Sequence, residues 1–322
     1  MLAVVAPGQG SQTPGFLSPW LELDGVRATL EHLCEAADLD LVVHGTTSDA
    51  ATIQDTAIAQ PLLVGAGLAC MEAVLPGAAG RVTEGRIDVL AGHSVGEVTA
   101  ASLAGVLAPA DAMALVRVRG DAMAEASAAV ATGMSAVIGG DPGAVEAALD
   151  AHGLTPANIN GAGQVVAAGT LEQLAALAAD PPPRAKVIPL KVAGAFHTAF
   201  MAPAVERLEA RAATVTADDP RTTLLGNADG DVVADGPQVL RRLVQQVSRP
   251  VRWDLCQQRM AGLGVTALLE LPPAGTLANL AKRALPGVEI VAVRTPDDVA
   301  AARELADRHA TAPVPQPQGG GS

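Results

Sequence analysis

A serine between two glycines, where a strand is expected to give way to a helix, is the feature that most constrains this chain. Residues 92–96 read GHSVG; they follow the short apolar run IDVLAG at 87–92 and precede the alanine-rich EVTAASLAGVL. This order fits the G-x-S-x-G elbow, which exposes a serine hydroxyl above a parallel sheet. The pattern predicts an α/β fold with Ser94 as a nucleophile. A tight turn without chemistry remains the alternative on the pattern alone.

A second buried strand is expected at the N-terminus, in LAVVAP at 2–7. The alanine-rich stretch QPLLVGAGLACMEAVL at 60–75 is typical of a helix between the two strands, and VTALLEL at 265–271 is a later strand. Strands that alternate with helices indicate a mainly parallel sheet with helices on both faces. We therefore expect an α/β-hydrolase-like core.

A smaller domain is predicted within this core, from about Ala128. Over 133–190 the pattern runs strand, helix, strand, strand, helix, strand, which is the ferredoxin-like order. The large domain then comprises 1–127 and 199–309, with a helix at 200–215 where the chain returns to it. The Pro-, Gln- and Gly-rich end at 310–322 is expected to be a flexible tail.

Composition and charge exclude several classes of function. The chain has 322 residues, 49% of them hydrophobic, so it can bury a sizeable core. Only 2% are aromatic and the formal net charge is -13, which disfavours nucleic acid as a partner. Cys34, Cys70 and Cys256 lie far apart without metal-binding spacing, so we expect neither disulfides nor a metal site.

No membrane or export signal is expected. The N-terminal apolar run is too short for a signal peptide, and no run is expected to reach the roughly 20 apolar residues of a membrane span. The predicted location is the cytoplasm.

A serine nucleophile needs a base, and six histidines are available. His197 follows KVAGAF in a predicted loop above the sheet and comes after the serine in the chain, as in α/β-hydrolases. His93 precedes the serine directly, where strand alternation points it elsewhere. The remaining four stand at helix ends or in ordinary polar contexts: His32, His44, His152 and His309. On the residues alone, a structural role for His197 stays an equal alternative.

An arginine is predicted to point into the interior. In the helix that begins near Pro109, Arg119 lies in the middle of an apolar face with 3.6-residue spacing, whereas Arg117 points outward and can pair with Asp121. An unpaired guanidinium in the interior is very costly, so a carboxylate partner is expected. This partner is either an Asp or Glu of the fold or a carboxylate of the substrate.

The chain resembles the malonyl-CoA:acyl-carrier-protein transacylases and the acyltransferase domains of polyketide synthases. The resemblance covers about residues 2–308. It is carried by PGQGSQ at 7–12, GHSVGE at 92–97, RG at 119–120 and AFHT at 195–198, with QVSRPVRWD at 246–254 and LPPAG at 271–275 in support.

The resemblance implies a role for each matching residue. Ser94 carries the acyl group, and His197 is its base, oriented by the backbone carbonyl of Gln246. The oxyanion hole is formed by the N–H groups of Gln9 and Val95, of which the second also follows from the elbow. Arg119 grips the free carboxylate of the malonyl group. No cofactor and no metal are implied.

The substrate and the partner also follow from the resemblance. Val95, Ala195 and Phe196 fit the malonyl rather than the methylmalonyl pattern, since Phe196 would crowd a 2-methyl group. Gly194 departs from the histidine common in polyketide domains, which favours a free-standing enzyme. The partner is an acyl carrier protein of fatty acid or polyketide synthesis. Because such carriers are acidic, a local basic patch is expected. Two clusters are candidates: Arg184, Lys186 and Lys191, or Arg241, Arg242, Arg249 and Arg252.

Two alternatives remain open from sequence. A serine esterase or lipase uses the same elbow, although Arg119 and the lack of a recognisable triad acid speak against it. A non-catalytic subunit that binds carrier proteins or thioesters would use the fold for docking alone, and the retention of Ser94, His197 and Arg119 speaks against it.

Overall fold

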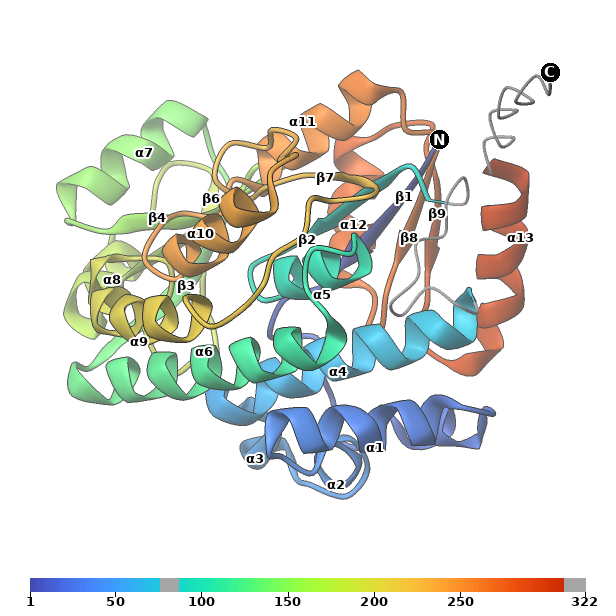
Figure 1. Ribbon diagram of the computed structural model, residues 1–322. Coiled ribbons are helices and arrows are strands. Elements are labelled where there is room, and N and C mark those ends of the chain that lie inside the picture. The colour runs from blue at the N-terminus through green and yellow to red at the C-terminus, as the bar shows by residue number, and fades with distance from the viewer. Residues whose placement is uncertain (76–86, 310–322) are drawn as a thin grey trace, which may run out of the picture.

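The computed structural model describes residues 1–75 and 87–309. Its larger part is built on a parallel sheet, as predicted, and the strands lie in the order β7-β2-β1-β8-β9 (Figure 1). The strands are β7 (Thr223–Leu224), β2 (Val89–Gly92), β1 (Leu2–Ala6), β8 (Ala267–Glu270) and β9 (Glu289–Ala292).

Strand β1 shows why this sheet is covered on both faces. Alternate side chains point to opposite sides of a strand, and all five residues of β1 are buried. Leu2 and Val4 belong to a core with α1 (Val26–Ala37), α4 (Thr56–Val74) and other helices on one face. Ala3 and Val5 belong to a second core, with α11 (Trp253–Leu263) and α12 (Thr276–Ala284) on the other face. The run LAVVA is therefore apolar throughout.

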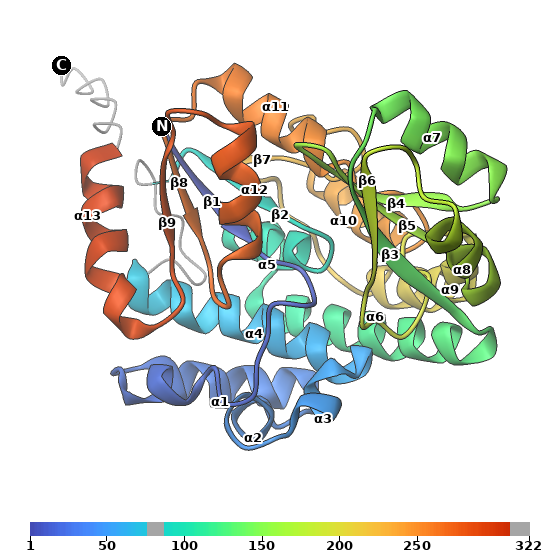
Figure 2. The ribbon, with the colours of Figure 1, turned by 180° about the vertical axis from the view of Figure 1, so that it is seen from behind.

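The remaining helices of the large part lie around this sheet or beside the smaller, antiparallel sheet (Figures 1 and 2). They are η1 (Ser18–Glu22), α2 (Leu41–Thr46), α3 (Ala50–Gln54), α5 (Gly96–Leu103), α6 (Pro109–Ala129), η2 (Ala199–Met201), α9 (Ala202–Ala212), α10 (Gly236–Gln246), η3 (Pro296–Asp298) and α13 (Val299–His309). The helix predicted at 200–215 thus ends earlier, at Ala212.

Helix α4 corrects one expectation from the sequence. It is 19 residues long and apolar enough to cross a membrane by length and composition, with a mean hydropathy of 1.6. The expectation that no run reaches this length was therefore wrong. However, 83% of that stretch is buried inside the fold, where α4 packs against α6 and α1. A helix that is apolar on every side is typical of a core position, and α4 is the central helix of this protein.

The smaller part is a four-stranded antiparallel sheet in the order β4-β5-β3-β6. Its strands are β3 (Thr132–Gly139), β4 (Thr155–Gly161), β5 (Gln164–Thr170) and β6 (Ala185–Pro189), and its helices are α7 (Pro142–Ala151) and α8 (Leu171–Ala179). This element order is the ferredoxin-like one that the sequence predicted, and all six elements lie within 128–198.

The two parts meet along a shared apolar core. One face of the small sheet packs on α7 and α8. Its other face contributes Met134 and Val166 to a cluster that also contains Met123 of α6 and Leu208 of α9. Figure 2 shows α6 running beneath both sheets. Helix α6 thus runs between the small sheet and the end of β2, and its own side chains contact both parts of the fold.

The three cysteines are free, as expected, and two of them, Cys70 and Cys256, are buried. The predicted tail at 310–322 lies outside the described residues.

Candidate active site

The serine elbow has the geometry that its sequence predicts. Strand β2 ends at Gly92, α5 begins at Gly96, and Ser94 between them has a φ of 54°. Both glycines are required, because a Cβ on Gly92 would overlap the backbone of Gly96, and a Cβ on Gly96 would overlap the carbonyl of Ala6. A left-handed serine is strained, and the surrounding packing holds it there.

The hydroxyl of Ser94 meets the predicted base. Ser94 Oγ lies 2.7 Å from His197 Nε2, although the two residues are 103 positions apart in the chain. His197 Nδ1 lies 2.8 Å from the backbone carbonyl of Gln246. A carbonyl can only accept a hydrogen bond, so the proton sits on Nδ1 and Nε2 is free to accept from Ser94. This is the arrangement that the resemblance implied for these three residues.

The environment keeps this imidazole neutral. His197 is 3% exposed, and burial, reinforced by the positive charge of Arg119, lowers the pKa of His197 to about 3. At neutral pH its Nε2 therefore carries no proton and can take one from Ser94.

Arg119 points inward from α6, as its helical spacing predicted. It is 1% exposed, and Arg117 on the opposite face pairs with Asp121 at 3.2 Å. Nη1 donates to Gln60 Oε1 at 2.5 Å and Nη2 to Gln246 Oε1 at 2.8 Å, and Nη2 lies 3.4 Å from Ser94 Oγ. The guanidinium therefore lies directly beside the Ser94 hydroxyl.

The contacts of Arg119 decide between the two partners that the sequence left open, an Asp or Glu of the fold and a carboxylate of the substrate. Within the described residues, Arg119 forms no ion pair and its Nε has no hydrogen-bond partner. Burial lowers the pKa of Arg119 to about 10, so the group remains protonated at neutral pH. A buried cation held only by neutral oxygens has capacity for an anion. A structural ion pair, the competing interpretation, is not what holds this arginine.

The loop after β1 lies against the elbow, where the oxyanion hole is expected. A Cβ on Gly8 would lie 2.9 Å from the carbonyl oxygen of His93, which shows how closely the loop approaches. The backbone N–H groups of Gln9 and Val95 donate no hydrogen bond within the described ranges. Both amides are therefore available to an oxyanion.

Sequence reasoning missed three polar residues that hold the serine elbow and Arg119 in place. Asn227 accepts from the Ser94 N–H at 2.9 Å and donates to the Gly92 carbonyl at 2.7 Å. Gln60 holds Arg119. Glu97, the last residue of GHSVGE, accepts from the Asn227 N–H at 2.8 Å and from Gln246 Nε2.

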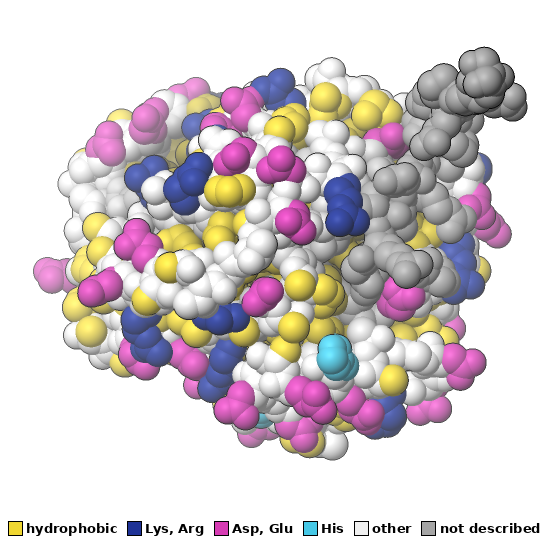
Figure 3. Space-filling model, viewed as in Figure 1, with side chains coloured by type: hydrophobic (Ala, Val, Ile, Leu, Met, Phe, Trp, Pro, Cys, Tyr) yellow, Lys and Arg dark blue, Asp and Glu magenta, His cyan; other side chains and the backbone are white. Residues whose placement is uncertain are grey.

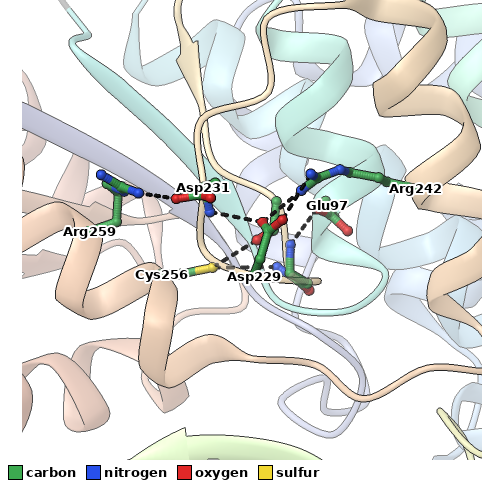
Figure 4. A network of polar contacts seen from close by, with 8 residues as sticks. Glu97, Asp229, Asp231, Arg242, Cys256 and Arg259 are labelled. Atoms are coloured by element: carbon green, nitrogen blue, oxygen red, sulfur yellow. Dashed lines mark hydrogen bonds and ion pairs between the residues drawn. The ribbon is translucent and has the colours of Figure 1, made fainter.

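Glu97 is a buried carboxyl group with an unusual titration. It is 4% exposed, and burial raises the pKa of Glu97 to about 7 against the opposing effect of its hydrogen bonds to Asn227 and Gln246. Figure 4 shows it beside Arg242, whose guanidinium is directed at Asp229.

The residues before His197 have different surroundings. Phe196 is 6% exposed and belongs to the apolar cluster between α6, α9 and the small sheet. Gly194 packs against α6 so closely that a Cβ there would lie 2.5 Å from Ser127 Oγ. The absence of a larger side chain at position 194 thus has a steric cause.

Three other histidines have contacts that serve the structure. His93 Nε2 contacts Asn160 Oδ1 at 2.9 Å, and its ring packs edge-on against Trp253. His44 contacts Ser48, and His309 contacts Thr266. Among the residues that the structure describes, no group of three or more His, Cys, Asp or Glu side chains could hold a metal ion.

A hollow of about 530 Å³ lies beside the segment that precedes His197, and neither Ser94 nor His197 lines it. Its walls include Gln54, Ser127 and Lys191. The backbone carbonyl of Gln54 accepts a hydrogen bond from the Gln9 side chain, and Ser127 packs against Gly194. Two residues that line the hollow therefore contact the loops that carry Gln9 and His197.

The two basic clusters differ in their partners. Arg184, Lys186 and Lys191 are exposed and form no ion pair within residues 1–75 and 87–309. In the second cluster only Arg249 lacks an acidic partner there, because the others form pairs: Arg241 with Asp235, Arg242 with Asp229 and Arg252 with Asp254. On the face in Figure 3, basic side chains are interspersed with acidic ones. The first cluster is thus the freer of the two.

Comparisons with known proteins agree with this geometry. Residues 4–303 match the acyl transferase domain family. The chain is 50% identical over 299 residues to a malonyl CoA-acyl carrier protein transacylase of Mycobacterium tuberculosis (strain ATCC 25618 / H37Rv), covering 93% of this chain and 98% of the relative.

Solved structures show the same similarity. The crystal structure of MCAT from Mycobacterium tuberculosis superposes with a TM-score of 0.88 at 49% identity, covering 94% of this chain and 99% of that one. A malonyl-transacylase solved in complex with its type II PKS acyl-carrier protein superposes with a TM-score of 0.84 at 30% identity, over 94% and 99% of the two chains.

Proposed function

The chain belongs to the acyl transferase domain family, and on that premise we infer that it transfers a malonyl group from malonyl-CoA to the phosphopantetheine thiol of an acyl carrier protein. It is an acyltransferase that supplies malonyl units for the synthesis of fatty acid or polyketide chains. The observation that carries this assignment is a serine–histidine pair beside a buried arginine that lacks a carboxylate partner.

In the proposed first half-reaction, Ser94 Oγ attacks the thioester carbonyl of malonyl-CoA. His197 Nε2 takes the hydroxyl proton, which the 2.7 Å contact and the lowered pKa of the imidazole support. The N–H groups of Gln9 and Val95 stabilise the oxyanion. The C–S bond then breaks, and the CoA thiolate leaves with the proton from His197.

The malonyl-serine ester is then held by its own charge. Its carboxylate pairs with Arg119, which fixes the ester beside the entering thiol. The phosphopantetheine thiol gives its proton to His197 and attacks the ester carbonyl. Ser94 leaves as an alkoxide and recovers that proton. The two half-reactions predict ping-pong kinetics.

We propose that this chemistry needs no metal and no resident cofactor, since the chain itself supplies nucleophile, base, oxyanion donors and carboxylate clamp. Dialysis against a chelator should leave the transfer rate unchanged. We also propose a cytoplasmic location, which fits the buried position of the one apolar helix of spanning length among the described residues.

Carrier docking is proposed at Arg184, Lys186 and Lys191. These side chains are exposed and free of acidic partners in the described structure, and Lys191 stands on the hollow beside the catalytic loop. An acidic carrier protein would meet uncompensated positive charge here, despite the net charge of -13.

Intact-mass analysis tests the proposed function. After incubation with malonyl-CoA, the wild-type protein should gain one malonyl group and lose it on addition of a phosphopantetheinylated carrier, which becomes malonylated. Methylmalonyl-CoA and acetyl-CoA should acylate more slowly. Hydrolysis of the ester without transfer to the carrier would instead support an esterase, and a carrier complex without any acylation would support a docking module.

A further inference from the structure

The side chain of Gln246 has a fixed orientation. Its Nε2 faces three acceptors: Glu97 Oε2, the Ser94 carbonyl at 3.1 Å and Asn227 Oδ1 at 3.1 Å. Its Oε1 accepts from Arg119 Nη2 at 2.8 Å. Only an NH₂ group suits the first set and only an oxygen suits the second, so one orientation of the amide satisfies both.

Gln246 thereby stands between a buried carboxylate and a buried guanidinium. In the described structure, Glu97 is the acidic group whose charge favours protonated Arg119, and it does so without contacting it. The other nearby cation, Arg242, is engaged by both carboxylate oxygens of Asp229, at 2.7 and 2.9 Å (Figure 4). The negative charge of Glu97 thus acts on Arg119 across the side-chain amide of Gln246. The guanidinium N–H groups of Arg119 meanwhile stay near Ser94.

Loss of the charge on Glu97 would be transmitted along this chain of contacts. A protonated Glu97 Oε2 would face the Gln246 NH₂ group, and two donors would then oppose each other. If the amide turned to relieve this, its NH₂ group would face Arg119 Nη2, which is also a donor. The orientation of the Arg119 guanidinium is therefore coupled to the ionisation of Glu97.

We propose that Glu97 is a positioning residue that acts on Arg119 through the Gln246 side chain, and that the preference for malonyl over uncharged acyl groups requires Glu97 to be ionised. This inference rests on the proposed function. Arg119 matters most for an acyl group with a carboxylate, so an uncharged acetyl group should be far less sensitive to Glu97.

The titration of Glu97 makes the coupling measurable near neutral pH. Burial raises the pKa of Glu97 to about 7. The other groups that face it have pKa values shifted away from the range of pH 6 to 8: Arg119, with a pKa of about 10, stays protonated, Asp229 has a lowered pKa, and burial raises the pKa of the Cys256 thiol. Arg242 also faces it and is engaged by both carboxylate oxygens of Asp229. His197, with a pKa of about 3, stays neutral.

The first test uses the wild-type enzyme. The ratio of kcat/KM for malonyl-CoA to that for acetyl-CoA, measured as acylation of Ser94, should fall about tenfold from pH 8 to pH 6, since about a tenth of a group with that pKa is ionised at pH 6. A ratio that stays constant over this range would overturn the proposal.

The second test is Glu97→Gln, with Glu270→Gln as the matched control. Glu270 is also fully buried, but its carboxylate accepts from the backbone N–H groups of Gly275, Leu277 and Ala278 at the start of α12. Glu97→Gln should lower the malonyl to acetyl ratio at pH 8 by more than about tenfold, to below the wild-type value at pH 6, and abolish its pH dependence. Glu270→Gln should keep both the ratio and its pH dependence.

Equal losses toward malonyl-CoA and acetyl-CoA in Glu97→Gln would show a merely structural role. If this variant does not fold, the wild-type ratio decides alone. Failure of the proposed function is distinguishable, because wild-type protein would then carry no malonyl group on Ser94 at all. A malonylated enzyme with a constant ratio would overturn only the role of Glu97.

Discussion

Two arginines face Glu97 from different helices. Their contacts show which of them has a structural role and which is available to a substrate. Arg242 of α10 is held by both oxygens of Asp229, so its charge is already matched. Arg119 of α6 is more deeply buried and is held only by amide oxygens and the Ser94 hydroxyl. The difference teaches that an arginine near a nucleophile is a candidate substrate clamp when the protein itself leaves its charge unmatched.

The largest expected effect tests whether Arg119 faces a reacting group at all. Ser94→Ala removes the nucleophile and should lower transfer by roughly 10⁴-fold, because no other side chain can form the ester. Intact mass after incubation with malonyl-CoA should show no acylated protein. Retained acylation would remove Ser94 from the mechanism and with it the comparison of the two arginines.

The next effect separates the two arginines directly. Arg119→Ala should lower kcat/KM for malonyl-CoA about 100-fold, since two charged hydrogen bonds of about 1.5 kcal/mol each are lost, and should leave acetyl-CoA within a few-fold. The measurement is acylation kinetics with both thioesters.

Arg242→Ala is the matched control. It should destabilise the fold by about 1 to 2 kcal/mol. Because the charge of Arg242 lowers the pKa of Glu97, the malonyl to acetyl ratio is compared at about pH 9, where Glu97 stays ionised, and it should be unchanged there. An unchanged ratio in Arg119→Ala, or an altered one in Arg242→Ala, would break the distinction between the two arginines.

Glu97 should reveal its charge in stability as well as in selectivity. Its pKa is raised from 4.5 to about 7 on folding, so the folded protein binds more protons than the unfolded chain between these values. Stability therefore falls as the pH rises through this window, by up to about 3 kcal/mol. In Glu97→Gln this contribution of Glu97 disappears.

Urea unfolding at pH 5 and pH 8 measures this effect. The free energy of unfolding of Glu97→Gln, taken relative to wild type, should rise by up to about 3 kcal/mol between the two values. An identical pH dependence in variant and wild type would show that Glu97 does not titrate here.

The smallest effect concerns the carrier protein. Reversing Lys186 and Lys191 to Glu should raise the KM for the carrier roughly fivefold, because exposed pairs contribute at most about 1 kcal/mol each, and should leave the KM for malonyl-CoA unchanged. Arg241→Glu is the control, because Arg241 already pairs with Asp235. If the two KM values rise together, this cluster does not dock the carrier.

The sequence predicted those parts of the site that local patterns encode. The flanking glycines predicted the strained turn at Ser94, and helical spacing predicted the inward direction of Arg119. His197 followed from its loop position and from the resemblance, and the role of the Gln246 carbonyl from the resemblance alone. The fold class and the ferredoxin-like order of the small sheet followed from alternating elements.

The parts that sequence could not predict depend on distant pairs. Gln60 contacts Arg119 across 59 positions of the chain, Asn227 contacts Ser94 across 133, and Glu97 contacts Gln246 across 149, and no periodicity marks such contacts. The apolar length of α4 was underestimated because the predicted stretch began at Gln60, whereas the helix begins at Thr56 and its first turn is partly buried as well.

The most direct test of the account is a crystal structure of the protein with malonyl esterified to Ser94. The account predicts that the malonyl carboxylate lies within hydrogen-bond distance of two guanidinium nitrogens of Arg119, with Arg242 still on Asp229. A malonyl carboxylate that points to solvent or pairs with another cation, while Arg119 keeps only its amide partners, would contradict it.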